Sequence, residues 1–252
     1  MKKVIYLFIL ILFFTFQSVS QVDNIKQKSK SFKSGNDYGN SNSYDGIAGL
    51  LFFLFNDVAI NSIDMLIVHH QYLIENKENY PIAFSADYMP HLAFNQNNQY
   101  NMLQRIRGTL GVFSTDFRLN YLTEISDLSA KSYSTLDWQI IQFSTYPSNN
   151  VNIRFGTGLL YDNYSDLSFN EHSLGLELYF KDYEYWFALD GRFALDYERG
   201  ESVYKELNFR CNYRIIKTQH FNTYFTIGAL YQNYYSVTDL FSAQGGLSIN
   251  LH

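Results

Sequence analysis

Three adjacent polar residues, Glu171, His172 and Ser173, are of the types that nucleophilic hydrolases use. In such a site a histidine takes the proton of the serine hydroxyl, and an acid orients the histidine. The residues that follow alternate between apolar and polar types, which predicts a strand, and adjacent side chains of a strand point to opposite faces. His172 and Ser173 therefore cannot pair directly, and we expect a polar pair at a strand end without a catalytic role.

Histidines also offer nitrogen ligands for a metal ion. Four histidines are candidate ligands: His69, His70, His91 and His172. Adjacent histidines rarely bind one ion together, and no cysteine or carboxylate stands at a ligand spacing beside them. We expect no metal and no cofactor.

Arginines and acids recur at alternate positions, so that they share one face of the predicted strands. Seven of the eight arginines lie on such polar faces, whereas ten of the eleven lysines lie in the N-terminal segments or in connections. A crowded interior favours arginine, because its planar guanidinium binds a carboxylate through two hydrogen bonds and is less strongly hydrated than an ammonium. We predict a ladder of charges that lines a barrel lumen, with a structural or pore-lining role: Arg105, Arg107, Arg118, Arg154, Glu177, Asp190, Arg192, Asp196, Glu206, Arg210 and Arg214.

Within this ladder we expect Arg192, Arg210 and Arg214 to pair with acids on neighbouring strands. The candidate partners are Glu177, Glu184, Asp190, Asp196 and Glu206. Side chains just fill a barrel of about eight strands, and a slightly larger one leaves little free space. A filled, salt-bridged lumen is therefore favoured over a path for small solutes.

A two-residue alternation of apolar and polar side chains supplies the elements that position these charges. From Tyr183 to Tyr197 the odd positions are mostly aromatic or aliphatic and the even ones mostly polar or small, as in a strand with two unlike faces. Ten strands are predicted, over residues 82–93, 102–113, 117–123, 135–146, 151–161, 173–180, 183–197, 204–216, 221–232 and 241–251. The phase shifts near Ile140, which predicts a β-bulge, and Pro90 makes the first strand the weakest prediction.

The connections between the predicted strands alternate between long and short. This is typical of membrane barrels, which have short periplasmic turns and longer external loops. The longer connections near 124–134 and 162–172 are rich in Asp, Ser, Tyr and Asn, and we expect them to form the contact surface. An even number of strands places both ends of the barrel on one side.

The N-terminus has the organisation of a secretory signal peptide. Lys2 and Lys3 precede an apolar run, and a small-residue site follows, so residues 1–20 are predicted to be removed before Gln21. An uncleaved anchor is the alternative.

Residues 21–45 are polar without apolar periodicity and are predicted to be a flexible lead-in. Residues 46–75 are apolar at a spacing closer to helical, which favours a helix against the barrel or the membrane surface; one more strand over 62–74 is the alternative. Residues 81–252 form the predicted barrel domain.

Composition excludes some other classes of protein. Loss of Lys2 and Lys3 with the signal peptide takes the formal charge from −5 to −7, which argues against a nucleic-acid binder. The only cysteine, Cys211, allows no internal disulfide and falls on the apolar face. The chain has 22 Tyr and 22 Phe but three Pro, as expected for long strands with aromatic girdles.

The signal peptide and the pattern over residues 81–252 resemble bacterial outer-membrane β-barrel proteins, especially the small ones common in Bacteroidetes. The resemblance implies an all-β fold, an antiparallel up-and-down transmembrane barrel of about ten strands. It also implies the outer membrane as location, with outer-membrane lipids and the barrel assembly machinery as partners, and it leaves any extracellular ligand open.

The function predicted from these features is that of an outer-membrane barrel of structural, adhesion or narrow-channel type, without catalysis. A soluble secreted or periplasmic barrel, similar to a lipocalin, is the first alternative, because the same alternation suits an apolar lumen that binds a lipophilic ligand. Some small membrane barrels are lipid A deacylases or acyltransferases with a Ser and a His at the membrane interface. A lipid A-modifying enzyme that uses His172 or Ser173 is therefore the second alternative.

Overall fold

The computed structural model describes residues 21–35, 84–95, 99–126, 129–144, 150–197 and 199–251. They form one helix and ten strands: α2 (Gln21–Gly35), β1 (Phe84–Asn95), β2 (Gln99–Leu110), β3 (Phe113–Ser126), β4 (Ser129–Ser144), β5 (Val151–Asp162), β6 (Leu167–Phe180), β7 (Tyr185–Asp196), β8 (Glu201–Lys217), β9 (Phe221–Tyr234) and β10 (Thr238–Leu251).

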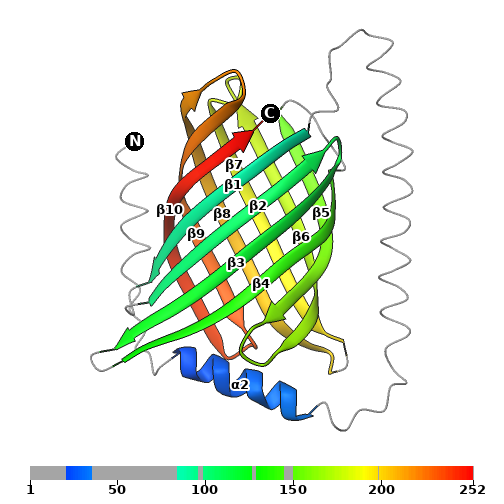
Figure 1. Cartoon of the computed structure of the whole chain (residues 1–252), viewed down its shortest axis with the longest axis vertical. Coiled ribbons are helices and arrows are strands. Elements are labelled where there is room, and N and C mark those ends of the chain that lie inside the picture. Colours follow the sequence, from blue (N-terminus) through cyan, green and yellow to red (C-terminus); the bar gives the residue numbers. More distant parts are fainter. Residues whose placement is uncertain are drawn as a thin grey trace.

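The ten strands form a closed antiparallel barrel (Figure 1). Each strand pairs with its neighbours in sequence, and β1 pairs with β10 to close the sheet. Closure leaves no strand edge unpaired, which a barrel in lipid requires because no water is there to satisfy the backbone groups. The predicted fold class and the number of strands are confirmed.

Two irregular sites in the sheet follow from particular residues. The register between β4 and β5 shifts between Trp138 and Ile141, which confirms the bulge predicted near Ile140. Opposite this bulge, a Cβ atom on Gly158 would lie 1.9 Å from the carbonyl oxygen of Trp138, so only glycine allows this close approach. In β1 the pairing with β10 skips Met89 and Pro90, as expected because proline has no N–H to donate.

The predicted alternation of long and short connections is wrong. The five connections at one end of the barrel span only residues 96–98, 127–128, 163–166, 197–200 and 235–237, because the strands continue into the predicted loops. In this region the inward side chains still alternate, but the outward ones, such as Ser168 and Asn170, are polar. The sequence pattern fades there because the outer face loses its apolar residues, although the strand continues.

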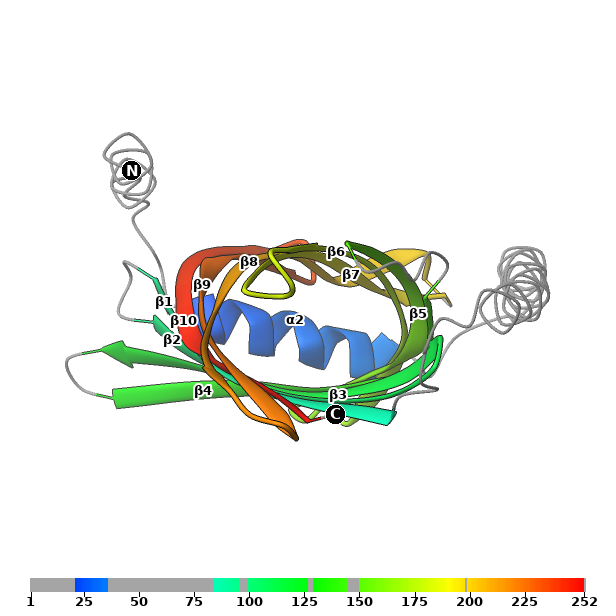
Figure 2. The ribbon, with the colours of Figure 1, turned by 90° about the horizontal axis from the view of Figure 1, so that it is seen from above.

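The predicted flexible lead-in is also wrong over its first part, since residues 21–35 form α2. The helix lies across one end of the barrel (Figures 1 and 2). Its buried residues Val22, Ile25, Ser29 and Phe32 are spaced three or four apart and so share one helical face. Three apolar residues among many polar ones give a weak signal in the sequence, and contact with the barrel stabilises the helix.

The rest of the N-terminal predictions lie outside the described residues. These are the signal peptide (1–20), the end of the lead-in (36–45) and the apolar segment (46–75). α2, the helix among the described residues, is too short and too polar to span a bilayer.

The two faces of the barrel wall differ in polarity. Large apolar side chains cover the outer wall, where Ile106 is 54%, Leu207 51% and Phe241 63% exposed. Polar and charged side chains point inward and are buried, as Asn208 and Arg210 are in β8. This is the arrangement expected of a membrane barrel, whereas a soluble lipocalin-like barrel requires the reverse.

Candidate functional site: the interior of the barrel

Side chains divide the interior into three layers along the barrel axis. Under α2 lies an apolar and aromatic layer, the mouth cluster, made of Val22, Ile25, Phe32, Leu122, Tyr133, Leu160, Phe169, Ala194, Val203, Tyr204, Tyr234, Tyr235 and Leu240. The middle layer consists of buried charges. At the opposite end, Trp186, Ala188 and Tyr224 form a smaller cluster with Tyr179 against it.

The middle layer is one continuous ion-pair network. Among the described residues, twelve ion pairs within 4.0 Å join six arginines and seven acids: Arg105, Arg107, Arg118, Arg154, Arg192 and Arg210 with Asp87, Asp116, Asp137, Glu171, Glu177, Asp190 and Glu206. The formal charges nearly cancel. Burial of so many ions is tolerable only because each has opposite charges beside it.

The network joins opposite walls of the barrel. Strands β2 and β7 lie five places apart in the ring of ten, and so do β3 and β8. Arg105 of β2 contacts Asp190 of β7 at 3.2 Å. Arg118 of β3 contacts Glu206 of β8 at 2.6 Å. These side chains therefore cross the lumen at its middle.

Arginines hold the network together, because five of the six contact more than one acid. The Arg118 guanidinium donates to Asp137 from Nε at 2.6 Å and reaches Glu206 with another nitrogen. Glu171 lies 4.0 Å away on the other side. A planar guanidinium with five N–H groups suits such a shared position, which a lysine ammonium would fill less well.

Acids are shared in the same way. Asp116 accepts hydrogen bonds from Arg105 at 2.7 Å and from Arg192 at 2.8 Å. Glu177 accepts from Arg154 at 2.6 Å and from Arg107 at 3.2 Å. No ion of the network can therefore be removed without leaving another charge short of a partner.

The structure brings nine residues of the predicted ladder into this network: Arg105, Arg107, Arg118, Arg154, Glu177, Asp190, Arg192, Glu206 and Arg210. As expected, Arg210 pairs with Asp190 on the neighbouring strand. Arg192 binds Asp116 across the lumen and also lies 3.8 Å from Glu171 of the neighbouring β6.

For three residues the structure differs from the prediction. Asp196 lies near α2 and contacts Arg199 at 3.7 Å instead of a network arginine. Arg214, expected to pair with a lumen acid, donates instead to the Asp182 carbonyl oxygen at 2.8 Å in the exposed β6–β7 turn. The register shift between Arg214 and Ile216 ends the regular alternation there. Glu184 also lies in that turn.

Four acids of the network were missed by the sequence analysis: Asp87, Asp116, Asp137 and Glu171. Asp116 and Glu171 fell in predicted connections, and Asp87 in the weakest predicted strand. A usable signal was present, because Asp116 stands two positions before Arg118 and Glu171 two before Ser173. Continuation of the strand period across the predicted turns places these acids on the inward face.

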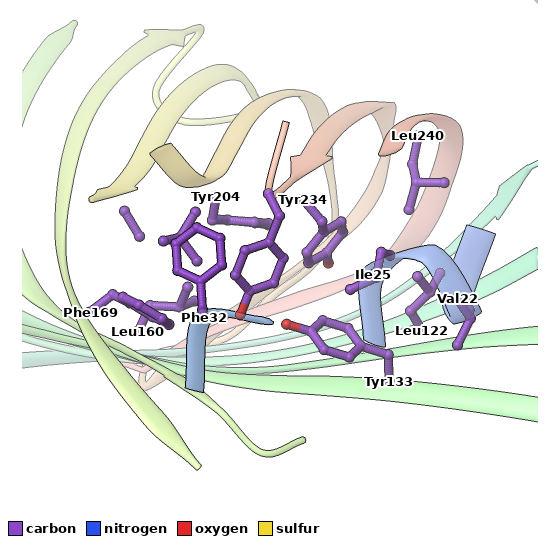
Figure 3. Packing of buried hydrophobic residues seen from close by; sticks show 13 residues of the cluster. Val22, Ile25, Phe32, Leu122, Tyr133, Leu160, Phe169, Tyr204, Tyr234 and Leu240 are labelled. Atoms are coloured by element: carbon purple, nitrogen blue, oxygen red, sulfur yellow. The ribbon is translucent and has the colours of Figure 1, made fainter. Parts of the chain in front are cut away.

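The mouth cluster holds the apolar face of α2 (Figure 3). The Phe32 ring is central, with its centroid 5.0 Å from that of Tyr235 and 6.3 Å from that of Phe169. In the same cluster, Tyr204 and Tyr234 pack ring to ring at 5.0 Å. Burial of these rings stabilises the helix on the barrel.

Polar contacts fix the position of α2. Ser29 Oγ donates to Asp162 Oδ2 at 2.6 Å, and the Tyr235 hydroxyl donates to the same oxygen. Burial and the Asp162 carboxylate raise the pKa of Tyr235, so this hydroxyl stays protonated and remains a donor. At the helix N-terminus the Val22 N–H donates to Glu124 at 2.9 Å, where a carboxylate is favoured by the helix dipole.

The C-terminal half of α2 is held by Arg199. Its guanidinium donates to the Phe32 carbonyl oxygen at 2.5 Å and stacks 4.5 Å from the centre of the Phe32 ring. Asp23, on the first turn, forms an ion pair with Lys131 of β4. The helix thus contacts several strands around the barrel rim.

The hydrolase candidate has the geometry that the strand period predicts. Ser173 points into the barrel and donates to the side-chain oxygen of Gln139 at 2.9 Å. His172 lies on the outer wall, where its ring nitrogens contact Tyr197 Oη at 2.6 Å and Thr157 Oγ1 at 3.1 Å. Glu171 belongs to the ion-pair network. The three groups do not meet in a catalytic arrangement.

Metal binding has no support among the residues that the structure describes. They contain no group of three His, Cys, Asp or Glu side chains placed to hold an ion. His69 and His70 lie outside these residues.

Comparison with known proteins gives distant structural similarities. No family model matches, and no curated protein matches. A KdgM porin in complex with disordered oligogalacturonate has a TM-score of 0.35 at 6% identity, covering 65% of this chain and 97% of that one. Neisserial surface protein A (NspA) has a TM-score of 0.29 at 7% identity, covering 67% and 94%. A bacterial polysaccharide outer membrane secretin has a TM-score of 0.32 at 9% identity, covering 68% and 72%. The description of this chain therefore rests on its own strand pairing and contacts.

Proposed function

We propose that this protein is a bacterial outer-membrane barrel with a closed interior, of structural or adhesion type and without catalysis. The ion-pair network is the observation that carries this proposal, because its side chains join opposite walls of the lumen. A channel requires a continuous polar path, and here the charges that would line it are bound to one another.

The location in the membrane is supported by the outer wall. An apolar surface around a whole barrel is far larger than the patches that soluble proteins expose, and lipid would remove it from water. Outer-membrane lipids around this wall and the barrel assembly machinery are the partners we propose. Export would use the predicted signal peptide.

Other functions fit the geometry less well. A narrow channel would need the contacts of Arg105 and Arg118 across the lumen to open. A lipophilic ligand has no apolar lumen at mid-height, because that layer is charged. A lipid A-modifying enzyme would need His172 and Ser173 on the same face of the wall.

The experiment that tests the membrane location is heat modifiability in a washed outer-membrane fraction. Unboiled and boiled samples are compared on one detergent gel, with a soluble periplasmic protein as the fractionation control. A folded membrane barrel resists the detergent in the cold, so we expect the protein in the membrane fraction with a mobility shift on boiling. A soluble protein without a shift would refute the proposal.

A further inference from the structure

Positive charge is concentrated on α2. Lys26, Lys28, Lys30 and Lys33 lie within eight consecutive residues of a chain whose formal net charge is −5. Across the described ranges none of these four lysines forms an ion pair, and the acid of the helix, Asp23, is paired with Lys131 of the barrel. Within the part of the chain that the structure describes, these four positive charges therefore have no acid at ion-pair distance.

Aromatic rings hold three of these lysines in place. The ammonium groups of Lys26 and Lys30 lie 5.1 Å and 5.4 Å from the centre of the Tyr164 ring in the β5–β6 turn. That of Lys28 lies 5.5 Å from the Phe32 ring. Such contacts restrict long side chains, so an anion that binds here has less side-chain entropy to overcome.

A groove adjoins Lys28. It has a volume of about 250 Å³ and is lined by Asn24, Gln27, Lys28 and Ser31 of α2 and by Val237 of the β9–β10 turn. Amide, hydroxyl and ammonium groups are hydrogen-bond donors that suit the oxygens of an anion. The surface thus offers both charge and donors.

The position of α2 indicates on which side of the membrane this surface lies. β1 begins and β10 ends at the end of the barrel opposite α2 (Figure 1). In an outer-membrane barrel with an even number of strands, both ends of the barrel chain lie on the periplasmic side. The α2 end is then external. This step rests on the membrane barrel proposed above.

The chain between α2 and β1 is long enough for this arrangement. Residues 36–83, 48 positions between Gly35 and Phe84, connect the two ends of the barrel. Even at the helical rise of about 1.5 Å per residue, the length of this segment exceeds the roughly 30 Å thickness of the hydrocarbon core of a bilayer. Its sequence is apolar over residues 46–75.

We propose that the lysine surface of α2 is a docking surface for phosphate groups of the glycolipids in the outer leaflet. Phosphates are the anionic groups that surround the external rim of an outer-membrane barrel, and clusters of lysines attract them. Their charge complements the four lysines, which form no ion pair among the described residues, and the groove beside Lys28 supplies the neutral donors.

The side of the membrane is tested first, with cysteines introduced into a Cys211→Ser background. Gln27→Cys lies on the outward surface of α2, and Gln219→Cys is its matched control in the β8–β9 turn at the opposite end. In intact cells a membrane-impermeant maleimide should label Gln27→Cys alone, and both variants after lysis. Labelling of the control alone, or of both in intact cells, would overturn the proposal.

The chemistry is tested on the full barrel in phosphatidylcholine vesicles with and without lipid A. Each preparation must show the heat-dependent mobility shift, and its absence would refute the membrane barrel and this inference together. A membrane-impermeant acylating reagent is then applied, and mass spectrometry gives the rate at each lysine. With lipid A we expect acylation of the α2 lysines to slow about fivefold. Lys217, at the opposite end, should not change.

Two further arms separate the possible sources of protection. Dephosphorylated lipid A, or about 0.5 M salt, should restore the original rates because both remove or screen the phosphate charge. Equal protection by dephosphorylated lipid A would overturn the proposal. Equal protection by inorganic phosphate at the same concentration would show a site for a free anion and would also overturn the lipid source.

Discussion

At the scale of single residues, the paired charges in the lumen dominate the behaviour of the protein. Isolated buried ions are costly, whereas a network in which every ion has partners is stable but sensitive to the loss of one member. Arg118 is the most connected arginine in this respect, since Asp137, Glu171 and Glu206 all lie within 4.0 Å of it.

Replacement of Arg118 by methionine should lower the free energy of unfolding by about 3–5 kcal/mol, because three acids lose a counter-charge in a dry interior. Urea unfolding in lipid vesicles, followed by tryptophan fluorescence, measures the change. Arg214→Met is the matched control at the exposed rim and should cost less than about 1 kcal/mol. Equal effects of the two substitutions would contradict the account of the network.

The Ser173→Ala variant should leave the lipid A of producing cells unchanged, because Ser173 Oγ binds Gln139 inside the barrel and His172 faces outward. Mass spectra of lipid A from cells with the wild type, Ser173→Ala or His172→Ala provide the comparison. A lipid species present only with the wild type would show that one of these residues has a catalytic role.

At this scale, the two-residue strand period predicted which charged residues lie inside the barrel. The arginines on polar strand faces were assigned to the inside, and Arg105, Arg118 and Arg210 are buried there. The prediction was wrong for Asp116, which was assigned to a turn. It was also wrong for Arg214, which lies at the last regular pair before a register shift and binds the β6–β7 turn. Contacts across the lumen, such as Arg105 with Asp190, depend on the closed ring of strands and have no local signal.

At the scale of elements, α2 is the part of the described structure that depends most on its surroundings. A 15-residue polar helix is marginal by itself in water. It is stabilised by the mouth cluster and by Asp162, Glu124 and Arg199 on the barrel. The sequence could not predict it because these partners lie more than 100 positions away along the chain.

Phe32→Ala should release α2 from the barrel, since it removes the ring that contacts Phe169, Tyr235 and Arg199 and costs about 3 kcal/mol or more. Amide hydrogen exchange over residues 22–33 should become much faster, while exchange in the strands stays slow. Asn24→Ala, on the exposed side of the helix, is the control and should leave exchange unchanged. Slow exchange in the Phe32→Ala variant would mean that other contacts hold the helix.

At the scale of the whole molecule, the apolar outer wall and the charged interior define the barrel. The strand count and the direction of each face followed from the sequence because both depend on a local two-residue period. The lengths of the connections could not be predicted from the sequence. The strands extend past the apolar belt, where the outer residues are polar and the two-residue period disappears. In the closed interior that we propose, the large side chains of ten strands fill the lumen, and α2 and the network block it at separate levels.

The most direct measurement of this closed lumen is the conductance of the purified, refolded barrel in planar lipid bilayers. The wild type and a variant that lacks residues 21–35 are compared, after each has shown the heat-dependent mobility shift. Both should give no discrete conductance steps, because the ion-pair network blocks the lumen even without the helix. Reproducible steps with the wild type would contradict the closed interior, and steps with the shortened variant alone would show that α2, and not the network, closes the barrel.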